Sequence, residues 1–229
     1  PSNVAALIVE PIAGSTGVLP PPKGYLERLR EICTKHGILM IFDEVVTGFG
    51  RLGCASAAEY FGILPDMITS AKAITNGAIP MGATFTAKHV YDGLMSGPEE
   101  QIELMHGYTY SGHPVAAAAC IATMDEYQEK KIFENARKMM PIWENAIHTL
   151  ADKPHVKDIR NLGIIAGIEL HPDKDGNEQG TKMFNDMWEK GLTLRPGASG
   201  CVAFSPPLIL NENHIDRLVS IVGDYLDGL

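Results

Sequence analysis

Short apolar runs recur along the first 90 residues and are separated by segments of helical or loop-like composition. Residues 23–36, for example, repeat leucine and isoleucine at helical spacing and end at Gly37. Strands that alternate with helices favour an α/β architecture with a largely parallel sheet. The expected strands lie at residues 4–9, 38–42, 66–70 and 82–86.

The pattern changes after an alanine-rich stretch, where Pro114 is expected to start a long helix to about Lys131. The tail beyond it has the composition of a smaller α+β domain. We therefore predict a large domain at residues 1–135, which includes a linking helix, and a small C-terminal domain at residues 136–229. The expected tail elements are strands at 156–159, 164–170, 192–195 and 201–204, and helices at 181–190 and from about 212.

The composition is that of an ordinary globular protein, with 45% hydrophobic and 21% charged residues in 229. The net charge is −9 and the basic residues are scattered, which argues against nucleic acid as a partner. No apolar run approaches the ~18 residues that a membrane helix needs, so no membrane is expected as a partner. The cysteines form no CxxC pair, and we expect reduced thiols in a cytoplasmic protein. They are Cys33, Cys54, Cys120 and Cys201.

The first residue, Pro1, is not an initiator methionine, and residues 5–9 already have the composition of a buried strand. A domain rarely begins in the middle of its sheet. We therefore expect the chain to be a piece of a longer protein.

One motif matches the dinucleotide fingerprint G-x-G-x-x-G, at residues 48–53. Its context is wrong, because residues 44–47 separate it from the strand and the helix that follows is short. Asp66, at the offset of the expected ribose ligand, begins a strand instead of ending one. We interpret the motif as a tight turn. His106 and His113 lie near no acidic cluster, so no metal site is expected.

Asp43 and Lys72 both follow apolar strands. The carboxyl ends of parallel strands meet at one edge of a sheet, so an acid and an amine would face one crevice. Partial desolvation would make the Lys72 amine a usable nucleophile. Glu44 should face away from that crevice, because neighbouring strand residues point to opposite faces. A plain ion pair between Asp43 and Lys72 is an equally open interpretation.

Five segments, in order along the chain, resemble those of class III aminotransferases, which are fold type I enzymes. The lysine segment, with its ITNGAIPMGA sequence, is most similar to the ω-amino acid:pyruvate (β-alanine:pyruvate) aminotransferase subgroup. One departure is GASG at residues 197–200, where the family often has Gly-Asp. The segments are VEPIAGSTG at residues 9–17, FDEVVTGFGRLG at 42–53, SAKAITNGAIPMGA at 70–83, HGYTYSGHP at 106–114, and GLTLR at 191–195 with SPPL at 205–208.

The resemblance implies a role for five residues. Lys72 would carry pyridoxal 5′-phosphate covalently and transfer the substrate proton. Asp43 would keep the pyridine nitrogen protonated, and Val45 would pack on one face of the ring. Thr109 would bind the phosphate of a cofactor held by the other subunit of a dimer. Arg195 would pair with a substrate carboxylate through a bidentate fork.

The fold implied is the later part of the large cofactor-binding domain, with a partial, mostly parallel sheet, and then the small α+β C-terminal domain. The family's phosphate-cradling Gly-Ser turn and ring-stacking aromatic have no counterpart here. The implied reaction is ping-pong transfer of an amino group from an ω-amino acid or amine to pyruvate or another keto acid. Alternatives are an α-amino acid aminotransferase, an aminomutase, or a cofactor-free α/β binding module.

Overall fold

The computed structural model of the protein describes residues 3–100, 104–176, 179–198 and 200–229. The chain divides into two compact units, which are described separately below. Two segments, Ile12–Pro22 and Phe49–Ser56, belong to the second unit although first-unit sequence flanks them; the second unit otherwise spans Lys131–Leu229. The domain boundary between residues 135 and 136 stays a prediction.

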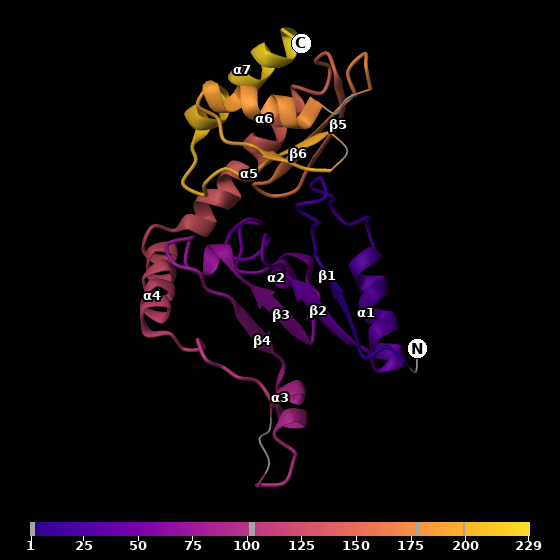
Figure 1. The fold of residues 1–229 in the computed structure, drawn as a ribbon, viewed down its shortest axis with the longest axis vertical. Coiled ribbons are helices and arrows are strands. Elements are labelled where there is room, and N and C mark those ends of the chain that lie inside the picture. Colours follow the sequence, from indigo (N-terminus) through magenta and orange to yellow (C-terminus); the bar gives the residue numbers. More distant parts are fainter. Residues whose placement is uncertain (1–2, 101–103, 177–178, 199) are drawn as a thin grey trace. The chain divides into compact units, whose positions relative to one another are not determined.

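The first unit contains a four-stranded sheet with the order β1-β2-β3-β4 (Figure 1). The first three strands are parallel, and β4 is antiparallel to β3. The predicted mostly parallel sheet is therefore confirmed. The strands are β1 (Ala6–Val9), β2 (Leu39–Asp43), β3 (Met67–Ser70) and β4 (Ala83–Thr86).

Helix α1 (Tyr25–His36) covers β2 through an apolar stripe. Its buried Leu26 and Cys33 pack in one cluster with Met40 and Phe42 of the strand. The helix ends where Gly37 takes a left-handed conformation with φ of 63°, which glycine adopts without strain. The other helices of this unit are α2 (Ala57–Phe61), α3 (Lys88–Leu94), which the sequence did not predict, and α4 (Pro114–Glu129).

Asp66 ties β3 to its neighbours just before the strand begins. Its Oδ2 accepts hydrogen bonds from the Met40 amide at 2.7 Å and from Arg30 at 2.8 Å, and His89 lies 3.1 Å from Oδ1. Burial alone would raise the pKa of Asp66, but these hydrogen bonds and the Arg30 charge outweigh it and lower that pKa. Asp66 is therefore a structural anchor.

The second unit has an antiparallel sheet with the order β5-β6-β8-β7. Helix α5 (Ile132–His148), which the sequence did not predict, precedes the sheet in the chain. The α+β character predicted for this part of the chain is confirmed. The remaining elements are β5 (Val156–Asn161), β6 (Ala166–Leu170), α6 (Gln179–Glu189), β7 (Arg195–Pro196), β8 (Cys201–Phe204) and α7 (Glu212–Asp227).

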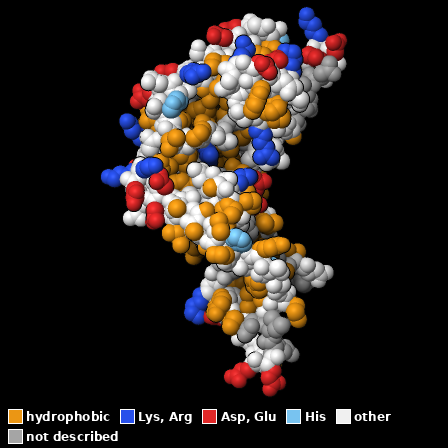
Figure 2. All heavy atoms as spheres, turned by 60° about the vertical axis from the view of Figure 1, so that its left-hand side comes forward, with side chains coloured by type: hydrophobic (Ala, Val, Ile, Leu, Met, Phe, Trp, Pro, Cys, Tyr) orange, Lys and Arg blue, Asp and Glu red, His pale blue; other side chains and the backbone are white. Residues whose placement is uncertain are grey.

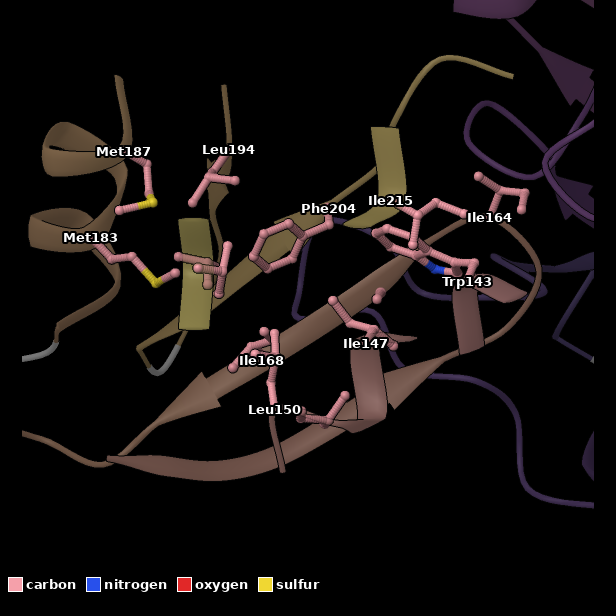
Figure 3. Packing of buried hydrophobic residues seen from close by; sticks show 14 of the residues in the cluster. Trp143, Ile147, Leu150, Ile164, Ile168, Met183, Met187, Leu194, Phe204 and Ile215 are labelled. Carbon is pink, nitrogen blue, oxygen red and sulfur yellow. The ribbon is translucent and has the colours of Figure 1, made fainter. Parts of the chain in front are cut away.

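The core of the second unit lies between its helices and one face of its sheet (Figure 3). Trp143 and Ile147 of α5 are fully buried in it, as are Met183 of α6 and Ile168 of β6. Each buried side chain of this size contributes about 1.5–3 kcal/mol by leaving water. This core holds in place the strands that carry the pocket described below.

Two further findings concern the described residues. Their helices include none that is both long and apolar enough to span a membrane. All four cysteines are free, and three of them, Cys33, Cys54 and Cys201, are buried.

Candidate active site

Asp43 is the last residue of β2 and lies beside Thr69 of the parallel strand β3. Its side chain is partly buried. Oδ1 accepts a hydrogen bond from the Val45 amide at 3.1 Å, which fixes the carboxylate against its own backbone. No other described residue donates a hydrogen bond to this carboxylate or forms an ion pair with it. One oxygen therefore remains available to a ligand.

Lys72 follows the next strand, β3, and begins the short 3₁₀ turn Lys72–Ile74. Its backbone is left-handed, with φ of 49°. The turn is held by its own hydrogen bonds and by Tyr127 of α4, whose hydroxyl donates to the Ala73 carbonyl at 2.8 Å. Sequence reasoning missed this contribution of Tyr127, since no local pattern connects it to the lysine.

The Lys72 side chain is exposed in its unit. We predicted partial desolvation from the buried strand before it, and this prediction is wrong, because the left-handed turn carries the lysine out of the strand's buried environment. Within the described residues, the Lys72 ammonium has no hydrogen bond and no ion-pair partner. In particular, Asp43 and Lys72 do not form the ion pair that was an open interpretation.

Glu44, beside Asp43, points into the unit and is 1% exposed. Its carboxylate accepts hydrogen bonds from the Ala57 amide at 2.5 Å, the Ala58 amide at 3.1 Å and the Thr47 hydroxyl at 3.3 Å. Burial raises the pKa of Glu44, and these hydrogen bonds oppose the rise without cancelling it. Glu44 thus satisfies the N-terminal amides of α2.

Thr109 is exposed and lies in the loop between residues 106 and 113. The loop and the residues Ile79–Gly82 line a pocket of 710 Å³ within the first unit. The Tyr108 amide donates to Nδ1 of His106 at 3.0 Å, and the two rings lie 4.4 Å apart. His106 therefore stabilises the loop, and no group of metal-ligating side chains is present among the described residues.

Helix α4, which follows this loop, is apolar in its first turns but buries only Ala116. Val115 is 59% exposed, Ile121 63%, and Tyr110 of the loop 85%. Figure 2 brings forward the side of the molecule that carries α4 in Figure 1 and shows hydrophobic side chains clustered on it. An exposed apolar surface of this kind is typical of an interaction site.

Arg195 belongs to the second unit, where it pairs in register with Ala203 of β8. It is exposed, and its guanidinium has no hydrogen bond and no ion-pair partner among the described residues. It lines a pocket of 470 Å³ with Phe204, residues 205–207 and Leu218. A free guanidinium at a mostly apolar pocket is suited to a small carboxylate.

The glycine motif at residues 48–53 forms a tight turn, as predicted. The Phe49 and Gly50 amides donate to the carbonyls of Ala55 and Cys54, both at 2.9 Å. Gly50 and Gly53 have φ of 103° and 73°, which explains why glycine stands at both positions. Arg51 on this turn contacts the second unit's pocket wall, which the sequence did not predict.

Comparison with known proteins identifies relatives along nearly the whole chain. The family model described as aminotransferase class-III matches residues 1–226. The ω-aminotransferase of Caulobacter vibrioides is 53% identical over 222 residues, which cover 96% of this chain and 50% of that protein. The β-alanine–pyruvate aminotransferase of Pseudomonas aeruginosa is 45% identical over 236 residues, which cover 100% and 51%. The chain thus spans about half the length of these curated relatives.

Solved structures agree with this result. The crystal structure of an amine transaminase from an uncultivated Pseudomonas species, in its pyridoxal-phosphate-bound form, superposes with a TM-score of 0.85 at 37% identity. The match covers 94% of this chain and 50% of that one. A thermostable (S)-enantioselective ω-transaminase from Thermomicrobium roseum gives a TM-score of 0.89 at 32% identity and covers 97% and 51%.

Proposed function

The chain belongs to the class III aminotransferases, and from this membership we propose that the protein carrying it transfers an amino group from an ω-amino acid or amine to pyruvate. The transfer uses pyridoxal 5′-phosphate in a ping-pong reaction. The observation that carries the proposal is a pair of groups at neighbouring strand ends: the Lys72 amine, and the Asp43 carboxylate, whose second oxygen has no hydrogen-bond partner among the described residues. The names of the relatives support the amino donor and acceptor classes.

The residues present fit the cofactor by the chemistry of their donors and acceptors. Pyridoxal phosphate offers an aldehyde, a basic ring nitrogen and a phosphate. The primary amine of Lys72 suits the aldehyde, and the Asp43 carboxylate, with one available oxygen, suits the ring nitrogen. The exposed hydroxyl of Thr109, in the loop pocket, suits the phosphate. When bound, the cofactor supplies the electron sink that stabilises negative charge at the substrate carbon.

The chain's own residues then have distinct tasks. Lys72 holds the cofactor and moves a proton at the substrate carbon that bears the amino group. The Asp43 carboxylate holds a proton on the ring nitrogen, while the Val45 amide prevents the carboxylate from rotating away. The Val45 side chain would pack on one face of the bound ring. Arg195 binds and orients the substrate carboxylate.

We also propose a homodimer or a higher oligomer in which Thr109 reaches the cofactor of the partner subunit. The exposed apolar side chains of α4 and of the loop before it support an interface at this surface. The partners we propose are otherwise small molecules and not nucleic acid or membrane. A cytoplasmic location is consistent with the four free cysteines, since reduced thiols are typical of a reducing compartment.

The cofactor-free binding module loses its support, because the ion pair that it required between Asp43 and Lys72 does not form among the described residues. An α-amino acid aminotransferase and an aminomutase would use the same cofactor residues. The two relatives described above are named ω-aminotransferase and β-alanine–pyruvate aminotransferase, and these names favour the reaction proposed here.

The proposal is tested by incubating the purified protein with β-alanine and pyruvate and measuring alanine. Lys72→Ala should abolish turnover. Borohydride reduction followed by peptide mapping should place the cofactor on Lys72. Lys88, which pairs with Asp92 at 2.7 Å, and the exposed Lys23 serve as internal controls. Cofactor on either of them, or an active Lys72→Ala variant, would show the assignment to be wrong.

A further inference from the structure

Arg51 bonds to two separate backbone segments of the second unit. Its Nη1 donates to the Ile164 carbonyl at 2.7 Å and to the Pro206 carbonyl at 2.8 Å. The Ile164 amide donates back to the Arg51 carbonyl at 2.8 Å. Arg51 therefore joins the turn between β5 and β6 to the loop after β8.

We propose that Arg51 is a positioning residue for the substrate-carboxylate pocket that Arg195 lines. The inference rests on the proposed function, because it assumes that Arg195 binds a carboxylate. Ser205, Pro206 and Pro207 form one wall of that pocket. Arg51 does not line the pocket itself and acts through this wall.

The wall is poor in backbone donors. Pro206 and Pro207 have no amide hydrogen, so neither can donate a ladder or turn hydrogen bond. One backbone hydrogen bond, from the Leu210 amide to the Pro207 carbonyl at 3.1 Å, holds part of the loop, and two side chains add to it. Arg51 binds the Pro206 carbonyl, and Nδ2 of Asn135 binds the carbonyls of Leu208 and Leu210 at 2.8 and 3.0 Å.

The glycine turn is built to let Arg51 reach this loop. A Cβ at Gly50 would lie 2.7 Å from Cδ1 of both Leu208 and Phe133. A Cβ at Gly163 would lie 2.4 Å from the Arg51 carbonyl oxygen. A larger residue at Gly163 would force the β5–β6 turn and the Arg51 turn apart, and one at Gly50 would have to displace the side chains of Leu208 and Phe133. The glycines thus permit the close approach that the Arg51 hydrogen bonds require.

A lysine at position 51 would not reproduce the contact. One guanidinium nitrogen donates to both carbonyls, at 2.7 and 2.8 Å, and these two hydrogen bonds orient the planar group. The nitrogen of lysine lies one bond closer to the backbone than this Nη1 and falls short of both carbonyls. An ammonium is a more strongly hydrated point charge on a flexible stem. Arg51→Lys therefore keeps the charge but loses the fixed position of the wall.

The test compares Arg51→Ala and Arg51→Lys with a matched control, Arg137→Ala, in the protein that carries the chain. Arg137 also donates to the glycine turn, through Nη2 to the Gly53 carbonyl at 2.8 Å, but it is not bonded to the pocket wall. The readouts are the KM for pyruvate, the kcat, and the inhibition constant of propionate, an unreactive carboxylate.

Both Arg51 variants should raise the KM for pyruvate and the inhibition constant of propionate roughly tenfold, with kcat changed much less. Arg137→Ala should change neither constant by more than about twofold. Adding Arg51→Ala to Arg195→Ala should weaken propionate binding no further, because the wall acts only through the carboxylate site.

Equal effects of the Arg51 and Arg137 variants, or additive effects in the double variant, would overturn the inference. If Arg51→Ala does not fold, Arg51→Lys alone decides between these outcomes. A wild-type protein that does not use pyruvate would instead refute the proposed function.

Discussion

Gly163, in the turn between β5 and β6, gives a prediction whose size follows from the structure. Its φ is 64°, and a Cβ there would lie 2.4 Å from the Arg51 carbonyl oxygen and 2.8 Å from Cδ2 of Leu52. Backbone atoms cannot rotate out of the way as the end of a flexible side chain can. Gly163→Ala must therefore displace either the β5–β6 turn or the turn that carries Arg51.

Two costs add in this variant. The left-handed conformation costs alanine about 1–2 kcal/mol. Separating the two turns adds about 1–3 kcal/mol, since it breaks the Ile164–Arg51 hydrogen bonds or strains the packing. The free energy of unfolding should therefore fall by about 2–5 kcal/mol. Gly191→Ala supplies a control for the first cost alone, because Gly191 lies in the same unit, has φ of 79°, and no atom lies within 4 Å of its Cβ position.

The measurement is urea unfolding followed by tryptophan fluorescence. The chain's two tryptophans, Trp143 and Trp188, both lie in the second unit and report on its unfolding. Gly191→Ala should lower the free energy of unfolding by about 1–2 kcal/mol, and Gly163→Ala should lower it further. If the two variants lose the same free energy, the contact between the Gly163 turn and Arg51 does not contribute to stability and the reasoning is refuted.

Three further predictions concern single side chains. Asp43→Asn should lower kcat about 10²-fold or more, because the ring nitrogen loses the neighbouring charge that keeps it protonated. Glu44→Gln should change kcat much less, because the Glu44 side chain is buried under α2. A larger effect at Glu44 than at Asp43 would contradict this assignment. Arg195→Lys should slow the half-reactions of pyruvate and of amino acids roughly tenfold, while the half-reaction of amines without a carboxylate is nearly unchanged. Equal losses in these half-reactions, each measured separately in a single turnover, would argue against carboxylate binding. Asp66 has a folded-state pKa below its usual 3.8, so its carboxylate stabilises the protein fully above the unfolded-state pKa, and this stability is lost as the pH falls through the lower folded-state pKa. The free energy of unfolding, measured from about pH 6 to about pH 2, should depend less on pH in Asp66→Asn. Parallel pH profiles of the two proteins would contradict the structural role of Asp66.

Strands such as β2 (Leu39–Asp43) and β8 (Cys201–Phe204) were predictable because they are short apolar runs with buried side chains. Helix α3 (Lys88–Leu94) was not predictable, since it buries no residue and so has no apolar stripe. Helix α5 has an apolar stripe that the sequence contains: the buried residues lie at helical spacing and are Ile132, Ala136, Met139, Trp143 and Ile147. Pro141 inside the helix and the charged residues between these positions obscure that spacing.

The candidate site also has a part that the sequence predicts and a part that it does not. The sequence predicted that Asp43 and Lys72 lie at one edge of the sheet, because the ends of parallel strands meet there. The exposure of Lys72 could not be predicted, because it depends on a left-handed turn that no residue type requires. Arg195 has no hydrogen-bond partner among the described residues, and Arg51 donates a hydrogen bond to the Pro206 carbonyl. Both facts depend on which distant segments of the chain come into contact. No local sequence pattern predicts such contacts.

The glycine turn at residues 48–53 shows why the nucleotide interpretation fails on physical grounds. A phosphate site of this kind needs backbone amides that point at the ligand from a loop and the start of a helix. Here the amides of Phe49, Gly50 and Gly53 donate to the carbonyls of Ala55, Cys54 and Gly50, all at 2.9 Å. Those three donors are therefore satisfied inside the turn. The same glycine spacing instead allows a close approach of backbone to Leu208 and Phe133, and the turn directs the cationic side chain of Arg51 toward the Pro206 carbonyl.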